Sequence, residues 1–237
     1  MRTIYEDENI LVIDKPAGIV VFPEDKMKGE TLIARLLEKF PGLKNVGNAP
    51  RYGIVHRLDK ETSGILLIAK NNNALKFLQK QFQDQGVEKR YLALLTGNLK
   101  SERGIIETLI GRSPKDRKKQ KVYLPGEPQA QGKREAKTEY KVLTRLGQDF
   151  GGQRNYTLIE ALPKTGRTHQ IRTHFAYIHH PIAGDKKYGS KNQPCPKELK
   201  RLFLHATQLK IGLPNGEIKG FRSELPEDLK RVIEQLK

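Results

Sequence analysis

The feature that most constrains the fold is an unbroken apolar run, Ile65–Ala69, that directly follows a densely charged stretch. An apolar run of this length after a Thr-Ser-Gly turn predicts a buried β-strand. Just before it, His56 to Lys60 place a histidine, two cations and a carboxylate within five residues. Because a buried strand is a rigid support, we expect the loop that enters it to hold Asp59 in a fixed place.

Asp59 is a candidate for chemistry. It lies between Arg57 and Lys60, and nearby cations favour the ionised form of a carboxyl group. An ionised carboxylate in a fixed position is a candidate nucleophile or base. An ordinary turn with solvated charges is the alternative, since most charged loops are of that kind. The stretch by itself leaves both interpretations open.

Three longer motifs narrow the choice. His-Arg-Leu-Asp-Lys-Glu-Thr-Ser-Gly at 56–64 resembles the first signature of RNA pseudouridine synthases of the RluA type. The stretch 165–174, Thr-Gly-Arg-Thr-His-Gln-Ile-Arg-Thr-His, followed by 180–189, resembles the second signature. Residues 89–97, Lys-Arg-Tyr-Leu-Ala-Leu-Leu-Thr-Gly, resemble the segment that carries the family's active-site tyrosine. The motifs occur in the family's order, and the resemblance covers nearly the whole chain.

The resemblance implies an isomerase that turns uridine in RNA into its C-glycoside, pseudouridine. It assigns to Asp59 the carboxylate beside the sugar, acting either as a nucleophile or as a base. It assigns to Arg172 the cation that pairs with this carboxylate, because an unpaired buried charge is costly. It assigns to Tyr91 stacking on the base and a part in moving the C5 proton. A solvated helix residue and an ordinary strand aromatic are the plainer interpretations of Arg172 and Tyr91.

The same resemblance suggests residues that touch the RNA. A base must leave its stack before it reacts, and the arginine matching Arg57 enters the RNA or braces the flipped nucleotide. Ile171 packs under the base, or is a plain core isoleucine. Three further candidates, whose alternatives are a hydrogen bond within the loop or surface solvation, are His56, Arg167 and His169.

The charge of the chain points to the same class of partner. Lysine and arginine total 44 against 27 acidic residues, so the formal net charge is +17. A surplus this large favours a polyanion, and without an amphipathic basic helix we expect nucleic acid rather than lipid. The resemblance implies that this nucleic acid is structured RNA, ribosomal or transfer. The basic run 114–121 contains Lys118 and Lys119, candidates for phosphate contact. A solvated hairpin tip is the alternative.

Several classes of protein are disfavoured. There is no glycine motif for a dinucleotide or a P-loop, and isomerisation needs no cofactor, so none is expected. One cysteine and no histidine pair at helical spacing make a metal site unexpected. The lone Cys195 fits a reducing compartment, and no apolar segment approaches the ~20 residues of a membrane span. We expect a cytoplasmic monomer.

Many short strands and few helices predict an α+β fold with a mixed, largely antiparallel sheet. Strands are expected at 89–95, 136–143 and 155–162, the last two as a pair around a loop at 147–154. Thr31 and the stretch Asn71–Asn73 are expected to cap helices, with Gly86 closing the second. The resemblance implies the pseudouridine synthase fold: a bent central sheet in two halves with an active-site cleft. We expect residues 1–237 to be this single catalytic domain, without the N-terminal accessory domain of many relatives.

Two other functions compete with the isomerase. A non-catalytic RNA-binding protein on the same scaffold is disfavoured because Asp59, Tyr91 and Arg172 are all present. A hydrolase of the glycosidic bond usually needs two carboxylates, and no second acid is designated.

Overall fold

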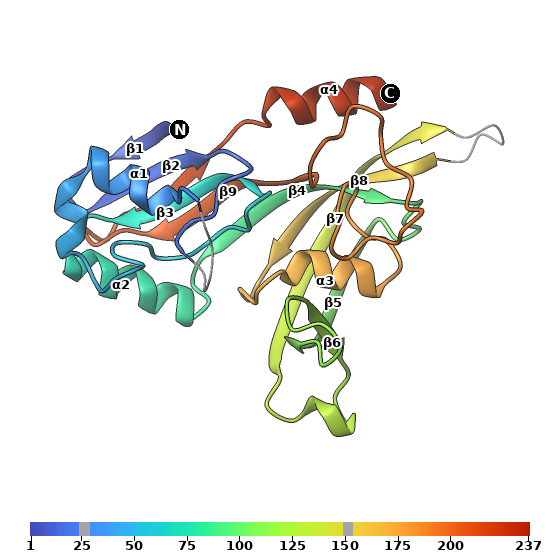
Figure 1. Cartoon of the computed structure of the whole chain (residues 1–237), viewed down its shortest axis with the longest axis horizontal. Helices are drawn as coiled ribbons and strands as arrows, with labels where there is room; N and C mark the ends of the chain where they lie inside the picture. Colours follow the sequence, from blue (N-terminus) through green and yellow to red (C-terminus); the bar gives the residue numbers. More distant parts are fainter. Residues whose placement is uncertain (24–28, 149–153) are drawn as a thin grey trace. The chain divides into compact units, whose positions relative to one another are not determined.

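The computed structural model describes residues 1–23, 29–148 and 154–237. They divide into two compact units, shown in Figure 1. Unit 1 comprises Met1–Lys89 and Ala206–Glu224, and unit 2 comprises Arg90–His205 and Leu225–Lys237. Each is described by itself.

Unit 1 combines a sheet with two α-helices. Its strands are β1 (Arg2–Glu6), β2 (Ile10–Lys15), β3 (Ser63–Ala69), the larger part of β9 (Leu204–Gly212) and β10 (Ile218–Arg222). They are hydrogen-bonded in the order β1-β2-β3-β9, with β10 on β9, and the pairs β1–β2, β2–β3 and β9–β10 are antiparallel. Its helices are α1 (Leu32–Lys39), the short 3₁₀ helix η1 (Pro41–Asn45) and α2 (Asn72–Gln83).

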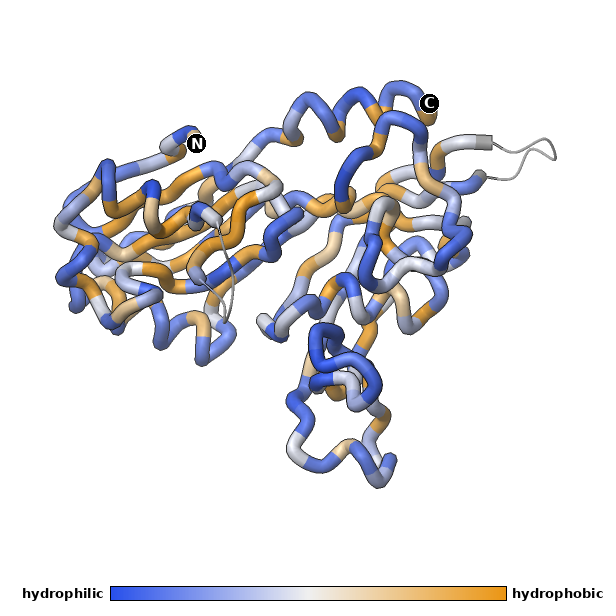
Figure 2. Tube along the Cα trace, viewed as in Figure 1, coloured by the Kyte–Doolittle hydropathy of each residue, from blue (hydrophilic) through white to orange (hydrophobic). Residues whose placement is uncertain are grey.

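Strand β3 lies at the centre of this unit. All seven of its residues are buried, and the facing stretch Ile10–Ile13 of β2 is fully buried as well. Figure 2 shows the two strands as hydrophobic segments. A strand buried on both faces reads as a continuous apolar run rather than an alternation, so the buried strand expected at 65–69 is confirmed. The loop that contains Asp59 therefore leads into a fully buried strand.

The helices of unit 1 begin where their capping residues predict. The side chains of Thr31 and Asn71 accept hydrogen bonds from backbone N–H groups in the first turns of α1 and α2. The prediction that Gly86 ends α2 as its C-terminal glycine is wrong in detail. Gln85 takes the left-handed backbone conformation, with φ of 60°, and Gly86 donates its N–H to the carbonyl of Gln81. The end of α2 is thus a left-handed turn in which the glycine comes one residue later.

The strands of unit 2 form antiparallel pairs. Its elements are β4 (Glu88–Thr96, whose first two residues fall in unit 1), β5 (Arg103–Arg112), β6 (Gln120–Tyr123), η2 (Pro128–Ala130), β7 (Arg134–Gln148), β8 (Arg154–Pro163), α3 (Gln170–Tyr177) and α4 (Glu227–Leu236). The strands are hydrogen-bonded in the order β4-β8-β7-β5-β6. The pairing predicted between 136–143 and 155–162 is confirmed, since β7 and β8 are antiparallel partners. Of the loop predicted at 147–154, residues 149–153 lie outside the described residues, and the flanking positions belong to the strands.

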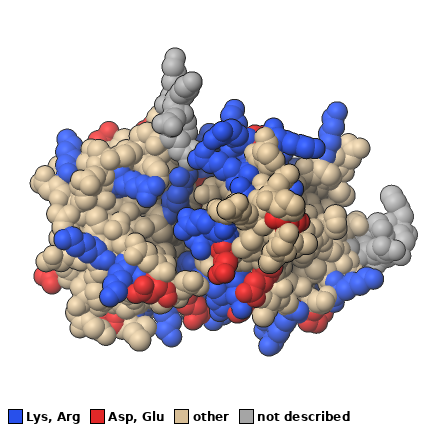
Figure 3. Space-filling view, turned by 90° about the horizontal axis from the view of Figure 1, so that it is seen from below, with Lys and Arg blue, Asp and Glu red and all other residues tan. Residues whose placement is uncertain are grey.

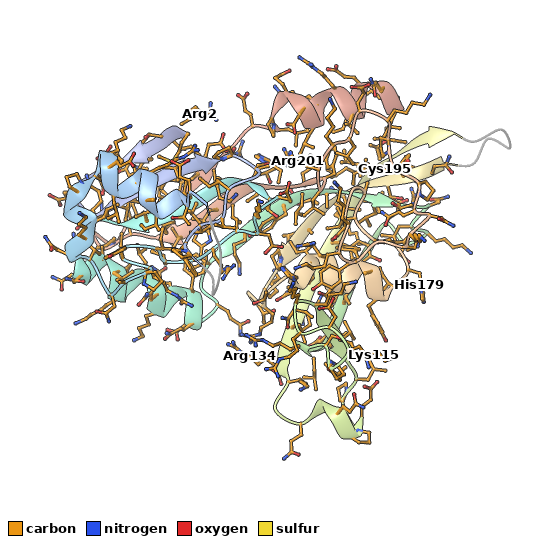
Figure 4. All side chains as sticks on the ribbon, viewed as in Figure 1. Arg2, Lys115, Arg134, His179, Cys195 and Arg201 are labelled. Atoms are coloured by element: carbon orange, nitrogen blue, oxygen red, sulfur yellow. The ribbon has the colours of Figure 1, made fainter. Side chains whose placement is uncertain are left out.

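Residues 113–133, between β5 and β7, form a hydrophilic segment that we call the finger (Figures 1 and 2). It contains β6, which pairs with β5 through Arg112↔Gln120 to Leu109↔Tyr123. Most of its residues are exposed. Figure 4 shows Lys115 on the finger and Arg134 at the start of β7. The hairpin expected around the basic run 114–121 is confirmed.

The described residues contain four α-helices and largely antiparallel strands, so the predicted α+β class is confirmed. No helix among the described residues is long and apolar enough to cross a membrane. That residues 1–237 make up a single catalytic domain stays a prediction.

Gly64, in β3, offers a test of how tightly this strand is packed. Its φ is +114°, and a Cβ there would overlap the carbonyl oxygen of Ala206 and lie 2.7 Å from its nitrogen. We expect Gly64→Ala to lower the free energy of unfolding by roughly 3 kcal/mol, through backbone strain and overpacking. Gly42→Ala is the control, because nothing lies within 4 Å of a Cβ at Gly42. Equal denaturation midpoints for the two variants would contradict the close packing of β3 on β9.

Candidate active site

Asp59 lies in a loop of unit 1 that is closed against β3. Ile54 forms an isolated bridge with Ile68 of that strand, just before the loop. After the loop begins to turn, the N–H of Thr62 donates to the Asp59 carbonyl at 3.1 Å. Asp59 is half-buried. Asp59 therefore lies on a short, hydrogen-bonded turn that leads into β3.

A fully buried lysine holds the end of this loop. The Nζ of Lys15 donates to the carbonyls of Pro16 at 2.8 Å, Ile19 at 2.9 Å and Lys60 at 3.2 Å, and Lys60 directly follows the aspartate. The N–H of Gly18 donates to the same Lys60 carbonyl at 2.8 Å. An ammonium group has three donors, and a buried charge is costly unless it is hydrogen-bonded. Sequence reasoning missed this role, because the only signal was a lysine that interrupts an apolar stretch.

His56 holds the start of the loop. Its Nε2 accepts a hydrogen bond from the N–H of Leu67 in β3 at 3.0 Å, and its ring stacks on Phe82 with centroids 4.8 Å apart. Burial, with a smaller contribution from the charge of Lys89, lowers the pKa of His56 to about 3. The ring is therefore neutral near pH 7, as an acceptor has to be. A contact of His56 with RNA stays a prediction, but its ring is already engaged within unit 1.

Arg57, the next residue, is exposed. Its guanidinium lies 4.9 Å from the centroid of the Phe22 ring, and that of Arg51 lies 5.1 Å from the same centroid. Guanidinium groups at these distances are attracted by the ring quadrupole. Two cations share one aromatic ring here, in the same unit as Asp59, and such a pair attracts an anion.

In unit 2, Arg172 is buried and forms a two-pronged ion pair. Its Nε and Nη2 donate to Oδ2 and Oδ1 of Asp185, each at 2.8 Å, and the Asp185 side chain is wholly inaccessible to water. Burial alone raises the pKa of the Asp185 carboxyl. The hydrogen bonds and charge of Arg172, with the N–H groups of Lys187 and Tyr188, outweigh it and hold this pKa below its usual value. The plain interpretation of Arg172 as a solvated helix residue is wrong.

A buried polar network joins α3 to the neighbouring strands. His174 is fully buried, with Nδ1 2.9 Å from Oγ1 of Thr138 in β7 and Nε2 3.1 Å from Oγ1 of Thr108 in β5. Burial lowers the pKa of His174 to about 4, so its ring is neutral. Gln170 donates to Thr138 and accepts from the hydroxyl of Thr165. These bonds set the position of α3, and with it that of Arg172; sequence reasoning did not identify His174.

The two basic candidates before α3 are both held by backbone or side-chain contacts. Arg167 donates through Nε to the carbonyl of Glu135 at 2.7 Å. Partial burial and the charge of Arg134 lower the pKa of Arg167. His169 takes a left-handed conformation, with φ of 54°, and its Nδ1 lies 2.7 Å from the hydroxyl of Tyr188.

Tyr91 and Ile171 contact the hydrophobic core of unit 2. Tyr91 is half-buried on β4, opposite Ala161 of β8. Ile171 is 6% exposed and belongs to the core itself. Their contacts with a base stay predictions.

Lys118 and Lys119 lie at the tip of the turn before β6. Their N–H groups donate to Oδ1 and to the carbonyl of Asp116, at 2.9 and 2.8 Å. The Nζ of Lys187 donates to the carbonyl of Lys118 at 3.2 Å. The finger and the loop that follows α3 are thereby joined, and they bring together the basic run 114–121 and Lys187. Figure 3 shows lysine and arginine side chains gathered on the viewed face.

The structure therefore groups the predicted residues in two sets. His56, Arg57 and Asp59 share one loop of unit 1. The unit 2 set is Tyr91, Lys118, Lys119, Arg167, His169, Ile171 and Arg172. The pairing of Arg172 with Asp59 joins the two units and stays a prediction, and the observed partner, Asp185, was not expected. Among the described residues, no group of three His, Cys, Asp or Glu could hold a metal ion.

Comparison with known proteins identifies the family. The family described as RNA pseudouridylate synthase matches residues 9–177, which include the Asp59 loop, Tyr91 and Arg172. The chain belongs to this family. RNA pseudouridylate synthases are isomerases that convert uridine in RNA to pseudouridine.

Individual proteins that are similar to this chain are also pseudouridine synthases by name. The chain is 44% identical over 242 residues to an uncharacterized RNA pseudouridine synthase of Aquifex aeolicus, covering all of this chain and 73% of the relative. It is 38% identical to ribosomal large subunit pseudouridine synthase D of Nitrosomonas europaea, of which it spans 65%. The solved structure of human RNA pseudouridylate synthase domain containing 1 is similar with a TM-score of 0.76 at 27% identity, covering 97% of this chain and 86% of the human one.

The Arg172–Asp185 pair predicts a large and pH-dependent stability effect. Arg172→Ala leaves a buried carboxylate without its cation, and we expect the free energy of unfolding at pH 7 to fall by about 3–5 kcal/mol. Because the folded pKa of Asp185 is lowered, its ionised form stabilises the wild type above the unfolded pKa of about 3.9. That contribution is lost as the pH falls through the folded value. The difference between the free energies of unfolding of the wild type and the variant, measured by urea unfolding, should therefore be smaller at pH 3 than at pH 7.

Lys230→Ala is the matched control, because it removes a cation from an exposed pair with Glu227. Its effect should stay within about 0.5 kcal/mol at both pH values. If Arg172→Ala behaved like this control, the buried pair would contribute little to stability.

Proposed function

We propose that this protein is an RNA pseudouridine synthase that isomerises specific uridines in structured RNA, with Asp59 as the active-site carboxylate. Membership of the family carries the proposal, together with the placement of Asp59 on a loop fastened by Lys15 at one end and His56 at the other. A carboxylate held in this way is pre-organised for reaction.

The reaction conserves atoms and electrons. The bond from N1 of the uracil to C1′ of the ribose breaks, the base turns, and a bond from C5 to C1′ forms. C5 loses its proton and N1 gains one. Asp59 either attacks the sugar or removes a sugar proton, and both routes need its ionised form. No cofactor or metal takes part in this balance.

Arg172 is assigned to the ionised Asp59. A guanidinium has five N–H donors in a rigid fork, and Asp185 accepts from Nε and Nη2. We propose that the same guanidinium also pairs with the Asp59 carboxylate. Asp185 thus sets the plane in which Arg172 meets its second acid, and this supports the role in orientation rather than in simple charge neutralisation.

The uridine is assigned to a flipped position. Extruding a base costs a few kcal/mol of lost stacking and pairing. Exposed Arg57, on the Phe22 ring, is assigned to brace or replace the extruded nucleotide, and Tyr91 and Ile171 to contact its base.

The rest of the RNA is assigned to the cations of unit 2. The candidates are Arg134 and Arg167, together with Lys118, Lys119 and Lys187 on or beside the finger. The names of the Nitrosomonas relative and of others make large-subunit ribosomal RNA the first substrate to test, with transfer RNA second. We propose that the enzyme acts in the cytoplasm as a monomer.

Replacement of the proposed carboxylate is the direct test. We expect Asp59→Asn to abolish pseudouridine formation in the purified protein while RNA affinity and melting temperature are retained, because the amide keeps the shape but loses the charge. Pseudouridine is mapped across RNA from cells that lack the protein, after incubation with each variant. Glu61→Gln, which removes a neighbouring carboxylate, serves as the control and should remain active.

Substantial turnover by Asp59→Asn would refute the assignment. Release of free uracil by the wild type, with no pseudouridine, would identify a hydrolase instead. RNA binding without either product would identify a non-catalytic RNA-binding protein.

The finger predicts a salt dependence. Each phosphate contact steepens the fall of log affinity with log salt by roughly 0.7–0.9. Changing Lys118, Lys119 and Lys121 together to alanine should flatten this slope and raise the apparent KM. The exposed residues Lys197, Lys200 and Lys237, changed together, remove the same charge outside the finger. Equal slopes for the two triple variants would show that the basic run is only a solvated hairpin tip.

A further inference from the structure

Tyr188 lies where three features of unit 2 meet: the Arg172–Asp185 ion pair, the finger and the start of α3. It follows the last residues that the family match covers, 9–177. It is half-buried, and each part of it has a separate contact. The backbone faces the ion pair, the ring faces the guanidinium, and the hydroxyl faces the finger.

The backbone and ring of Tyr188 both hold the ion pair in place. Its N–H donates to Oδ1 of Asp185 at 3.1 Å, beside the N–H of Lys187 at 2.9 Å. The guanidinium carbon of Arg172 lies 5.1 Å from the centroid of the Tyr188 ring. A guanidinium stacked on an aromatic face and forked onto a carboxylate has its plane fixed from two directions.

The hydroxyl of Tyr188 connects this arrangement to the finger. It accepts a hydrogen bond from the N–H of Gln120, the first residue of β6, at 2.7 Å. It shares a second hydrogen bond of 2.7 Å with Nδ1 of His169, whose ring also meets the tyrosine edge-on with centroids 5.5 Å apart. Lys187 adds the bond from its Nζ to the carbonyl of Lys118. The backbone of the finger is therefore tied to the same loop that orients Arg172.

We propose that Tyr188 is a positioning residue that fixes the spacing between the RNA-binding finger and the guanidinium of Arg172. The inference rests on the proposed function, because it assigns Arg172 to the active site and the finger to the RNA. The aromatic ring is rigid and has contacts at both ends, so the finger cannot shift at Gln120 without moving either the hydroxyl bond or the stacked guanidinium. RNA held by the finger is thereby placed in register with the residue that orients Asp59.

Two substitutions distinguish the role of the Tyr188 hydroxyl from that of its aromatic ring. Tyr188→Phe removes only the hydroxyl, and the loss of one hydrogen bond to the finger should raise KM roughly 2- to 10-fold. Tyr188→Leu also removes the aromatic face, and misorientation of Arg172 should lower kcat by about 10-fold or more. Tyr188→Phe should lower kcat much less than Tyr188→Leu does. A purely structural role would instead lower the active fraction of both variants and leave KM unchanged.

Kinetics are measured on the full chain with an RNA that the wild type modifies. Amide hydrogen exchange at Gln120 is measured on the same proteins without RNA, and it should become faster in both variants. Tyr177→Phe is the control, because Tyr177 is exposed at the end of α3, and its kcat and KM should stay within about twofold of the wild type.

Besides unchanged KM values, two results would overturn the proposal. Unchanged exchange at Gln120 in Tyr188→Phe would show that the hydroxyl does not anchor the finger, whatever the activity. Equal kcat values for Tyr188→Phe and Tyr188→Leu would show that the ring does not orient Arg172. A wild type that forms no pseudouridine on any RNA refutes the proposed function, and the exchange measurement still decides whether Tyr188 anchors the finger.

Discussion

A charge removed from water has to be matched by hydrogen bonds. This requirement determines how the loop of Asp59 and the loop of Asp185 are held in place. Lys15 is buried and uses three carbonyl groups, one of them beside Asp59. Arg172 and Asp185 are buried and match each other in a two-pronged pair. Such groups add little net stability compared with apolar packing, but breaking them is costly. Their role here is therefore to hold specific backbone segments in one place.

Buried neutral histidines also hold segments in place through hydrogen bonds. His56 accepts a hydrogen bond from β3, and His174 bridges threonines of β5 and β7, in each case because burial keeps the ring uncharged. Each ring fastens a segment of the proposed site to the sheet: His56 fastens the loop of Asp59 to β3, and His174 fastens the helix of Arg172 to β5 and β7. The proposed catalytic groups thus lie on a loop and a helix that are hydrogen-bonded to strands, while the strands supply core side chains. A site built on such supports is more precise than one on free loops.

Most of the described lysine and arginine residues are exposed to water, unlike Lys15 and Arg172. With a net charge of +17, the protein attracts a polyanion over distances that salt shortens. Exposed cations of this kind supply affinity but little geometry. Geometry has to come from tied backbone, and the finger is tied at residues 118–120 to the loop of Asp185 and Tyr188. Under the proposed function, affinity and positioning are in this way carried by different atoms of the same segment.

Local rules were sufficient for much of the fold and for part of the site. The apolar run of β3, the caps at Thr31 and Asn71, and the pairing of β7 with β8 depend on neighbours along the chain, so the sequence alone determined them. The motifs likewise identified Asp59 and Arg172 as candidates. Only the tertiary structure decided what these residues touch. Lys15 reaches a carbonyl 45 residues away, and Arg172 takes Asp185 as its observed partner. Such pairs form because folding buries the two groups together, and no local pattern encodes which buried donor will meet which acceptor.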